Sequence, residues 1–210
     1  IFFCLLLAVW FLALRKKGQE ILQKESQPVR WKKDGLRDLR GVIHFHTIFS
    51  DGNGTIEEAL EAASLRGFQF AISSEHNTRR AREEGWEGWK KGVLHIVGEE
   101  KSTPQGHLLV IDDSLFFASH PTHPKRPFKT FDRALTGIEV LSGDTLFFQA
   151  MRVPPSSLLK GLFLFPSGLP FVIFSIYAEP SEVLSLWDSL SAQRKMVGIA
   201  AADAHQRISF

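Results

Sequence analysis

The sequence from Gly41 onward predicts an α/β domain with parallel strands. Short β-rich runs alternate with helical patterns, beginning with GVIHFH, TIEEALEAASLRG and FQFAISS. Such alternation is typical of strand–helix–strand units, whose successive strands lie parallel in one sheet. The composition agrees, since 44% of the residues are hydrophobic and 23% are charged, as in globular proteins. A length of 210 residues allows one domain with a sizeable core and a short appendage.

The N-terminal segment differs from this domain. Residues 1–14 form an unbroken apolar run that ends at Arg15, Lys16 and Lys17. A membrane-spanning helix needs roughly 20 residues, and the chain starts without Met in the middle of the apolar pattern, which we interpret as a truncation. We therefore expect residues 1–17 to be part of a single membrane-anchoring helix. A cleaved signal peptide and a buried helix are the alternatives.

Residues 18–40 are polar and basic and are predicted to be a linker. The net charge of the chain is only +2, which is too small to indicate a nucleic-acid-binding protein. The positive residues gather between Arg15 and Arg40, beside the apolar run, as in a membrane-surface flank. By the positive-inside tendency, this flank favours a cytoplasmic domain on a membrane anchor.

Further elements are predicted in chain order. Thr55 and Glu58 have the spacing of a capping box at the start of the first helix, and Gly67 is expected to end that helix. Strands are predicted in VLHIVGEE, HLLVIDD and the final VGIAAADAH, which an amphipathic helix precedes. Residues 158–177 form a second apolar stretch. Because Lys160 and two prolines interrupt it, we expect short buried or interfacial helices there and not a membrane span.

Histidines and carboxylates stand near the ends of these strands. Alternate side chains of a strand point to the same face, so His44 and His46 are expected to project together. Asp203 and His205 repeat this arrangement after the last strand. Paired neutral imidazoles suit a transition metal. Cys4 is the only cysteine, which excludes an intrachain disulfide and a cysteine-based zinc site.

Five further acids and histidines stand where a predicted strand meets a loop: Asp51, His76, Glu100, His107 and His120. Barrel enzymes assemble their sites from several strands at the carboxyl face of the barrel. Each of the histidines taken alone is more often a surface residue or a hydrogen-bonded core residue. Together with the two pairs at the ends of the domain, they predict a metal site.

These motifs, in this order, resemble the PHP family, the polymerase and histidinol phosphatase domains. The match spans residues 41–205 and is carried by GVIHFHTIFSDG, AISSEHNT, VGEE with GHLLVID, ASHPTHP, GIEVLSG and AADAH. Glu75 stands where the family usually has Asp. Within this family, the sequence most resembles the small stand-alone phosphoesterases, and no polymerase domain is recognised.

The resemblance implies a distorted (β/α)7 TIM-like barrel over residues 41–210, with its last elements cut short after Phe210. It also implies a site for three divalent metal ions. The implied ligands are His44, His46, Asp51, His76, Glu100, His107, His120, Asp203 and His205. Glu100 is chosen over Glu99 because it keeps the Gly-x-Glu spacing from Gly98. Mixed histidine and carboxylate ligation suits manganese, zinc or iron better than magnesium or calcium.

The implied function is hydrolysis of a phosphomonoester or phosphodiester by in-line attack of a metal-bound hydroxide. The candidate contacts to the substrate phosphate are Arg79, Arg80, Lys125 and Arg126, although solvated loop charges are the alternative interpretation. His123 is a candidate acid for the leaving group and is otherwise a surface histidine. The expected partner is a small phosphorylated substrate, and no protein partner is inferred.

Two other functions stay open. A nuclease of the same fold should carry a basic groove or an aromatic stacking platform at the site, but the basic residues here lie beside the apolar N-terminus. Nucleic acid is therefore possible as a substrate but not favoured. A non-catalytic, membrane-tethered metal-binding module should have lost ligands, and none of the implied ligands is lost.

Overall fold

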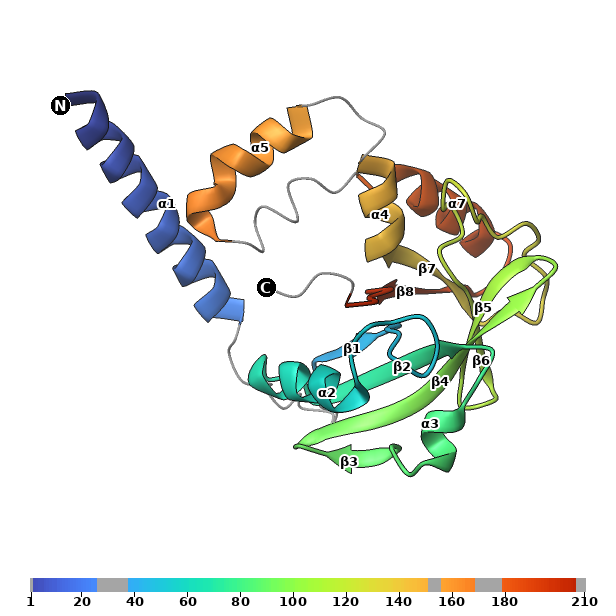
Figure 1. The fold of residues 1–210 in the computed structure, drawn as a ribbon. Coiled ribbons are helices and arrows are strands. Elements are labelled where there is room, and N and C mark those ends of the chain that lie inside the picture. Colours follow the sequence, from blue (N-terminus) through green and yellow to red (C-terminus); the bar gives the residue numbers. More distant parts are fainter. Residues whose placement is uncertain (1, 26–37, 151–155, 169–178, 207–210) are drawn as a thin grey trace. The chain divides into compact units, whose positions relative to one another are not determined.

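The computed structural model describes residues 2–25, 38–150, 156–168 and 179–206, which belong to two compact units (Figure 1). The first unit comprises residues 1–29 and 147–178, and the second comprises residues 30–146 and 179–210. The second unit holds the sheet and every residue predicted for the site.

The second unit is built on one mixed sheet. Its strands are β1 (Gly41–Ile43), β2 (Phe70–His76), β3 (Gly88–Lys90), β4 (Val93–Thr103), β5 (Gly106–Ile111), β6 (Leu115–Ala118), β7 (Gly137–Ser142) and β8 (Val197–Ala201). Their order is β1-β2-β4-β5-β6-β7-β8, and β3 pairs with β4. A parallel bridge between Phe45 and Ala204 joins the segments that follow β1 and β8. The seven-stranded path is therefore nearly closed into a barrel, consistent with a TIM-like fold.

The strand directions agree only in part with the predicted parallel sheet. β1, β2 and β4 are parallel neighbours, and so are β6, β7 and β8. In contrast, β5 is antiparallel to both β4 and β6. The turns on either side of β5 are too short for the crossover that parallel strands need. Asp112 and Asp113, which form the second turn, have φ values of 50° and 53°, as tight hairpin turns require.

The first helix of the barrel confirms the predicted capping box. In α2 (Ile56–Leu65), the Thr55 hydroxyl accepts from the Glu58 backbone N–H at 3.1 Å, and the Glu58 carboxylate accepts from the Thr55 N–H at 2.7 Å. The helix ends before Gly67, whose φ of 71° suits a helix stop. Leu60 of α2 is fully buried in a cluster with Phe45. This packing ties α2 to the segment that carries His44 and His46.

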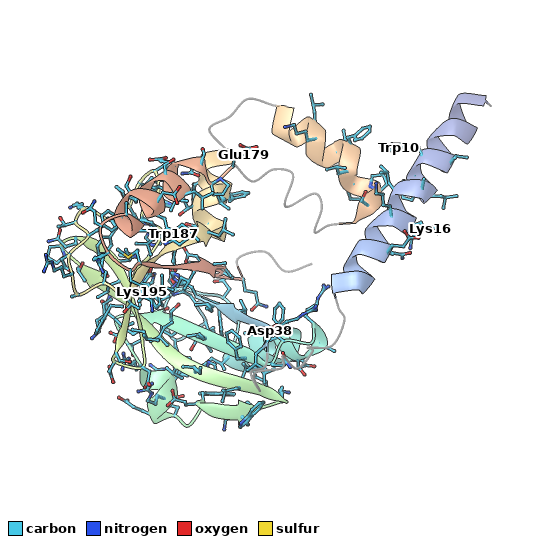
Figure 2. The ribbon with its side chains drawn as sticks, turned by 180° about the vertical axis from the view of Figure 1, so that it is seen from behind. Trp10, Lys16, Asp38, Glu179, Trp187 and Lys195 are labelled. Carbon is cyan, nitrogen blue, oxygen red and sulfur yellow. The ribbon has the colours of Figure 1, made fainter. Side chains whose placement is uncertain are left out.

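Two further helices accompany the sheet. The one-turn α3 (Arg80–Glu83) follows β2, and α7 (Ser181–Ser191) precedes β8. Trp187, labelled in Figure 2, belongs to α7 and donates from its indole nitrogen to the Met196 carbonyl at 3.0 Å. A separate buried cluster contains Ile72 of β2, Leu109 of β5 and Phe117 of β6. The strands therefore pack on apolar side chains on both faces of the sheet.

The first unit holds α1 (Phe2–Glu25), α5 (Ser156–Leu164) and the short 3-10 helix η1 (Phe165–Ser167), while α4 (Gly143–Ala150) begins in the second unit. Trp10 of α1 and Phe163 of α5 are in ring contact, with centroids 4.9 Å apart. The 3-10 helix η1, which contains Pro166, directly follows α5, so the α-helix within the second apolar stretch ends at Leu164. Residues 169–178 of that stretch lie outside the described residues.

The predicted membrane anchor over residues 1–17 is wrong, and so is the localisation that depends on it. Within the part of the chain that the structure describes, no helix is long and apolar enough to cross a membrane. α1 continues beyond the apolar run through Arg15, Lys16 and Lys17, so it is not an apolar helix over its full length.

Candidate metal centre

Histidines and carboxylates from distant parts of the chain meet at one edge of the barrel. β1, β2, β4 and β6 to β8 all end at this edge, and β5 begins there because it runs the opposite way. This reversal explains how His107, at the start of β5, reaches the same site. The structure brings together every predicted ligand: His44, His46, Asp51, His76, Glu100, His107, His120, Asp203 and His205. Their role as metal ligands remains a prediction.

The two histidines after β1 converge for a different reason from the one predicted. β1 ends at Ile43, and His44 has a φ of 65°, so strand alternation does not set its direction. The left-handed residue turns the ring so that Nε2 of His44 lies 3.1 Å from Nε2 of His46. Asp203, after β8, has a φ of 49°, and His120, after β6, has a φ of 31°. Such backbone conformations are costly for residues other than glycine and often gather at functional sites.

Glu100 lies at the centre of the cluster. Its carboxylate oxygens face five imidazoles, at 3.4 Å from His44, 3.6 Å from His46, 3.1 Å from His76, 3.3 Å from His107 and 3.1 Å from His120. Glu99, the neighbouring residue on β4, points to the opposite face of the strand. Its carboxylate lies 3.4 Å from Arg79 and 3.6 Å from Lys101. Between the two glutamates, only Glu100 is placed to bind a metal in this cluster.

Two aspartates complete the cluster, one exposed and one buried. Oδ1 of Asp51 lies 3.6 Å from His76 and 3.3 Å from His205, and the Asp51 side chain is 44% exposed. Oδ1 of Asp203 is buried and lies 3.4 Å from Nε2 of both His44 and His46. The cluster therefore extends from a buried end at His44 to a solvent-facing end at Asp51.

The donor set fits divalent cations. Three groups within the described residues each have their ligand atoms within 4.8 Å of one another: His46, Asp51, His76 and His205; His44, His46 and Glu100; His76, Glu100 and His107. Bonds of about 2.1 Å to one ion would place neighbouring ligand atoms about 3.0 to 3.4 Å apart. His46 Nδ1 and Asp203 Oδ2 are also buried without a hydrogen bond among the described residues, which a bound cation would remedy.

The electrostatics of the cluster favour added positive charge. Burial opposes the protonation of His44, but Glu139, Glu100 and Asp203 outweigh it and raise the pKa of this histidine well above its usual value. Burial likewise opposes the charged forms of Glu100 and Asp203, yet the imidazoles, led by His44, hold the pKa of both carboxyls far below the usual range. Ionised carboxylates are thus held together in a buried site, where cations compensate their charge.

The histidines at the outer side behave differently. Burial lowers the pKa of His76, and Glu100 counteracts this only in part. Burial, followed by the neighbouring His46, also lowers the pKa of His205. Both rings therefore favour the neutral form, which is the form that binds a metal.

Glu139 is a site residue that the sequence analysis did not single out. It lies in β7, is 1% exposed, and its carboxylate accepts from Nδ1 of His44 and from the backbone N–H of His120. The motif GIEVLSG contributes to the family resemblance, but no role was assigned to the glutamate within it. The sequence did contain one indication of its role: Glu139 is a charged residue within an otherwise apolar strand. A charged residue is rarely buried without a partner, so its position indicates a partner inside the protein.

Glu75, the departure from the family pattern, holds the loop after His46. It is fully buried, and its carboxylate accepts from the Thr47 N–H at 3.0 Å, the Thr47 hydroxyl at 2.6 Å and the Ser50 hydroxyl. These bonds fix the segment between His46 and Asp51. Glu75 therefore has a structural role in this chain, although the family usually has Asp at this place.

His95 and His123 are buried for different reasons. His95 lies away from the cluster, with Nδ1 at 2.8 Å from the Trp86 carbonyl and Nε2 at 3.0 Å from the Ser73 hydroxyl. Nδ1 of His123 accepts from the backbone N–H groups of Lys125 and Arg126, both at 3.1 Å. His123 is therefore not the surface histidine of the alternative interpretation. Its ring lies beside His120, with centroids 5.5 Å apart.

The three arginines among the predicted phosphate-binding residues contact acids. Arg79 contacts Glu99 and Asp113, Arg80 contacts Glu84, and Arg126 contacts Asp144. Arg80 also lies over the ring of Phe49, 4.9 Å from its centroid. The backbone carbonyl of Arg126 is 3.2 Å from Nδ1 of His120. The backbone at Arg126 therefore helps to orient the ring of His120, a predicted ligand.

A scan against protein-family models and a search of the curated proteins both find no match for this chain. Among solved structures, it is similar to a two-domain protein from Bacteroides vulgatus ATCC 8482 described as containing a predicted PHP-like metal-dependent phosphoesterase. The TM-score is 0.48 and the sequence identity is 18%. The match covers 80% of this chain and 52% of that chain, so this chain spans about half the length of the structure it matches.

Proposed function

We propose that residues 41–210 form a PHP-type metal-dependent phosphoesterase with a distorted (β/α)7 barrel. The observation that carries the proposal is the meeting of six histidines and three carboxylates at one barrel edge. The motifs that supply these residues follow one another along the sequence as in that family. The ligands, the number of three ions and the choice among manganese, zinc and iron are parts of this proposal.

Divalent ions at this site would lower the pKa of a bound water and neutralise the charge of phosphoryl oxygens. The protein residues hold the geometry for this chemistry. Buried Glu100 faces five imidazoles, Glu139 and Glu75 orient the segments around His44 and His46, and Asp51 opens the cluster to solvent. A phosphoester would approach from the Asp51 side, because this is the exposed end.

His123 is the candidate acid for the leaving group. Because Nδ1 accepts two backbone N–H groups, the proton of the neutral ring resides on Nε2. Nε2 lies 3.3 Å from the Asp144 carboxylate, which is partly exposed. A neutral His123 would thus present its Nε2 proton beside Asp144, and an acid in this position could protonate a leaving oxygen.

The charges around the site favour a small phosphorylated substrate over nucleic acid. A nucleic-acid groove should offer unpaired basic side chains and open aromatic faces. Here Arg79 and Arg126 contact carboxylates, and Arg80 covers Phe49 while contacting Glu84. The metal ions would then supply most of the phosphate binding, with Arg79, Arg80, Lys125 and Arg126 as outer contacts.

The proposal is tested with the full 210-residue chain, loaded with Mn²⁺ and assayed on p-nitrophenyl phosphate and bis-p-nitrophenyl phosphate. We expect metal-dependent hydrolysis of at least one substrate and its loss in His44→Ala and Asp203→Ala. Asp188→Ala, at an exposed acid of α7, is the control and should keep the activity. Metal-loaded protein that is inactive on both esters and on short oligonucleotides would overturn the enzyme proposal, and full activity in Asp203→Ala would overturn the site.

A further inference from the structure

One buried carboxylate connects two strained residues of the cluster. Glu139 of β7 accepts from Nδ1 of His44 with Oε1, at 2.5 Å, and from the backbone N–H of His120 with Oε2, at 2.7 Å. His44 follows β1 and His120 follows β6, so the two partners lie far apart in sequence. Both have positive φ values, 65° and 31°. A backbone in this region persists when surrounding contacts hold it.

The bond to His44 also determines which ring nitrogen faces the cluster. An ionised carboxylate only accepts hydrogen bonds, so Nδ1 of His44 must carry a proton. Nε2 is then the nitrogen available for a metal. It lies 3.4 Å from Glu100, 3.4 Å from Asp203 and 3.1 Å from His46. Carboxylates that accept from the remote nitrogen of a metal-binding histidine fix its tautomer and ring orientation.

We propose that Glu139 is a positioning residue that sets the tautomer of His44 and the backbone of His120 for metal binding. Both of its oxygens are engaged by these two donors, and Glu139 is not part of any of the three candidate ligand groups. It therefore acts through the ligands. This inference rests on the proposed metal site, since it assigns a role to Glu139 only if the cluster binds metal.

Replacement by glutamine provides a sharp test because the amide has one acceptor where the carboxylate has two. If the amide NH₂ faces His44, Nδ1 must accept, and the proton moves to Nε2, where it blocks the metal. If the NH₂ faces the His120 N–H, two donors meet and the backbone loses its acceptor. Either arrangement disturbs one predicted ligand, so we expect Zn²⁺ affinity to fall by about 10- to 100-fold.

The control is His95→Asn. His95 is as deeply buried as Glu139 and is hydrogen-bonded to Ser73 and Trp86, away from the cluster. Its replacement should lower the stability of the fold and leave Zn²⁺ affinity within about twofold of the wild-type value. Glu139→Asp keeps both acceptor oxygens on a side chain shorter by one methylene, and its affinity should lie between those of wild type and Glu139→Gln.

The experiment measures Zn²⁺ affinity by competition with a chromophoric chelator, and the ¹⁵N imidazole shifts of Zn²⁺-loaded wild type and Glu139→Gln. We expect His44 of the wild type to show a protonated Nδ1 and a metal-bound Nε2, and Glu139→Gln to lose this pattern. Affinity and shifts equal to wild type would overturn the inference. If Glu139→Gln does not fold, the inference is tested with Glu139→Asp. A Zn²⁺ affinity of Glu139→Asp equal to that of His95→Asn would then overturn the inference. A wild-type chain that binds no Zn²⁺, Mn²⁺ or Fe²⁺ would instead refute the proposed function.

Discussion

Replacement of Gly52 by alanine should disturb the proposed metal centre through one backbone contact. A Cβ at this position would lie 2.3 Å from the carbonyl oxygen of His46 and 2.7 Å from the backbone nitrogen of Thr47. An ordinary contact begins at 3.4 Å, so the Asp51–Gly52 segment must shift by about 1 Å. Overpacking of this kind costs about 1 to 3 kcal/mol, and a misplacement of about 1 Å can cost on the order of 100-fold in function. We expect Mn²⁺ affinity to fall by about 10- to 100-fold.

Two other glycines provide the controls for Gly52→Ala. For a Cβ on Gly54, in the same loop, the three nearest atoms all belong to the side-chain amide of Gln206, the far end of a flexible side chain. Gly67 has a φ of 71° and open space around it, so alanine there costs about 1 to 2 kcal/mol from backbone strain alone. Urea unfolding with and without Mn²⁺ measures stability and metal affinity together. Mn²⁺ affinity for Gly52→Ala equal to that of Gly67→Ala would refute the reasoning.

Two more predictions concern the charges of the cluster. Glu100→Gln should abolish the Mn²⁺-dependent rise in melting temperature and Glu99→Gln should not, because only Glu100 faces the imidazoles; the opposite ranking would show that Glu99 is the ligand. Burial opposes the protonation of His44 and His120, but the neighbouring carboxylates, Glu139 for His44 and Glu100 for His120, outweigh it and raise the pKa of both rings. This favours the protonated rings in the metal-free protein, so metal binding should release protons. The protonated rings add to the free energy of unfolding of the metal-free protein below about pH 6.5, and this contribution is lost as the pH rises through the raised pKa. Because the metal competes with these protons, metal affinity should increase with pH. Calorimetry in two buffers of different ionisation enthalpy measures the release, and equal heats in both would contradict it.

The sequence predicted several of the strands and the proximity of the site residues, but it did not predict α3, β3 or the details of the site geometry. The capping box at Thr55 depends on local spacing alone, and it was confirmed. The predicted ligands lie close together because parallel strands end at one edge of the sheet, an arrangement that strand–helix alternation already indicates. The reversal of β5 depends on two short turns and was missed. The membrane anchor was wrong because the charged residues after position 14 continue the same helix.

The backbone of the site could not be inferred from residue types. Positive φ values at His44, His120 and Asp203 arise from tertiary contacts, and histidine in a strand-like motif does not signal them. Glu139 was missed for a related reason. Its two partners follow β1 and β6, and no local pattern on β7 indicates which donors a buried carboxylate will meet. A buried charge in an apolar strand was the only signal.

The most direct test of the central claim, a multinuclear metal centre, is anomalous diffraction from crystals of the full chain grown with Mn²⁺. The account predicts three anomalous peaks, each within about 2.0 to 2.4 Å of nitrogen or oxygen atoms of His44, His46, Asp51, His76, Glu100, His107, His120, Asp203 or His205. One or two peaks at these residues would reduce the number of ions and keep the site. The absence of any peak bound by these side chains, in protein that is folded and saturated with Mn²⁺, would contradict the account.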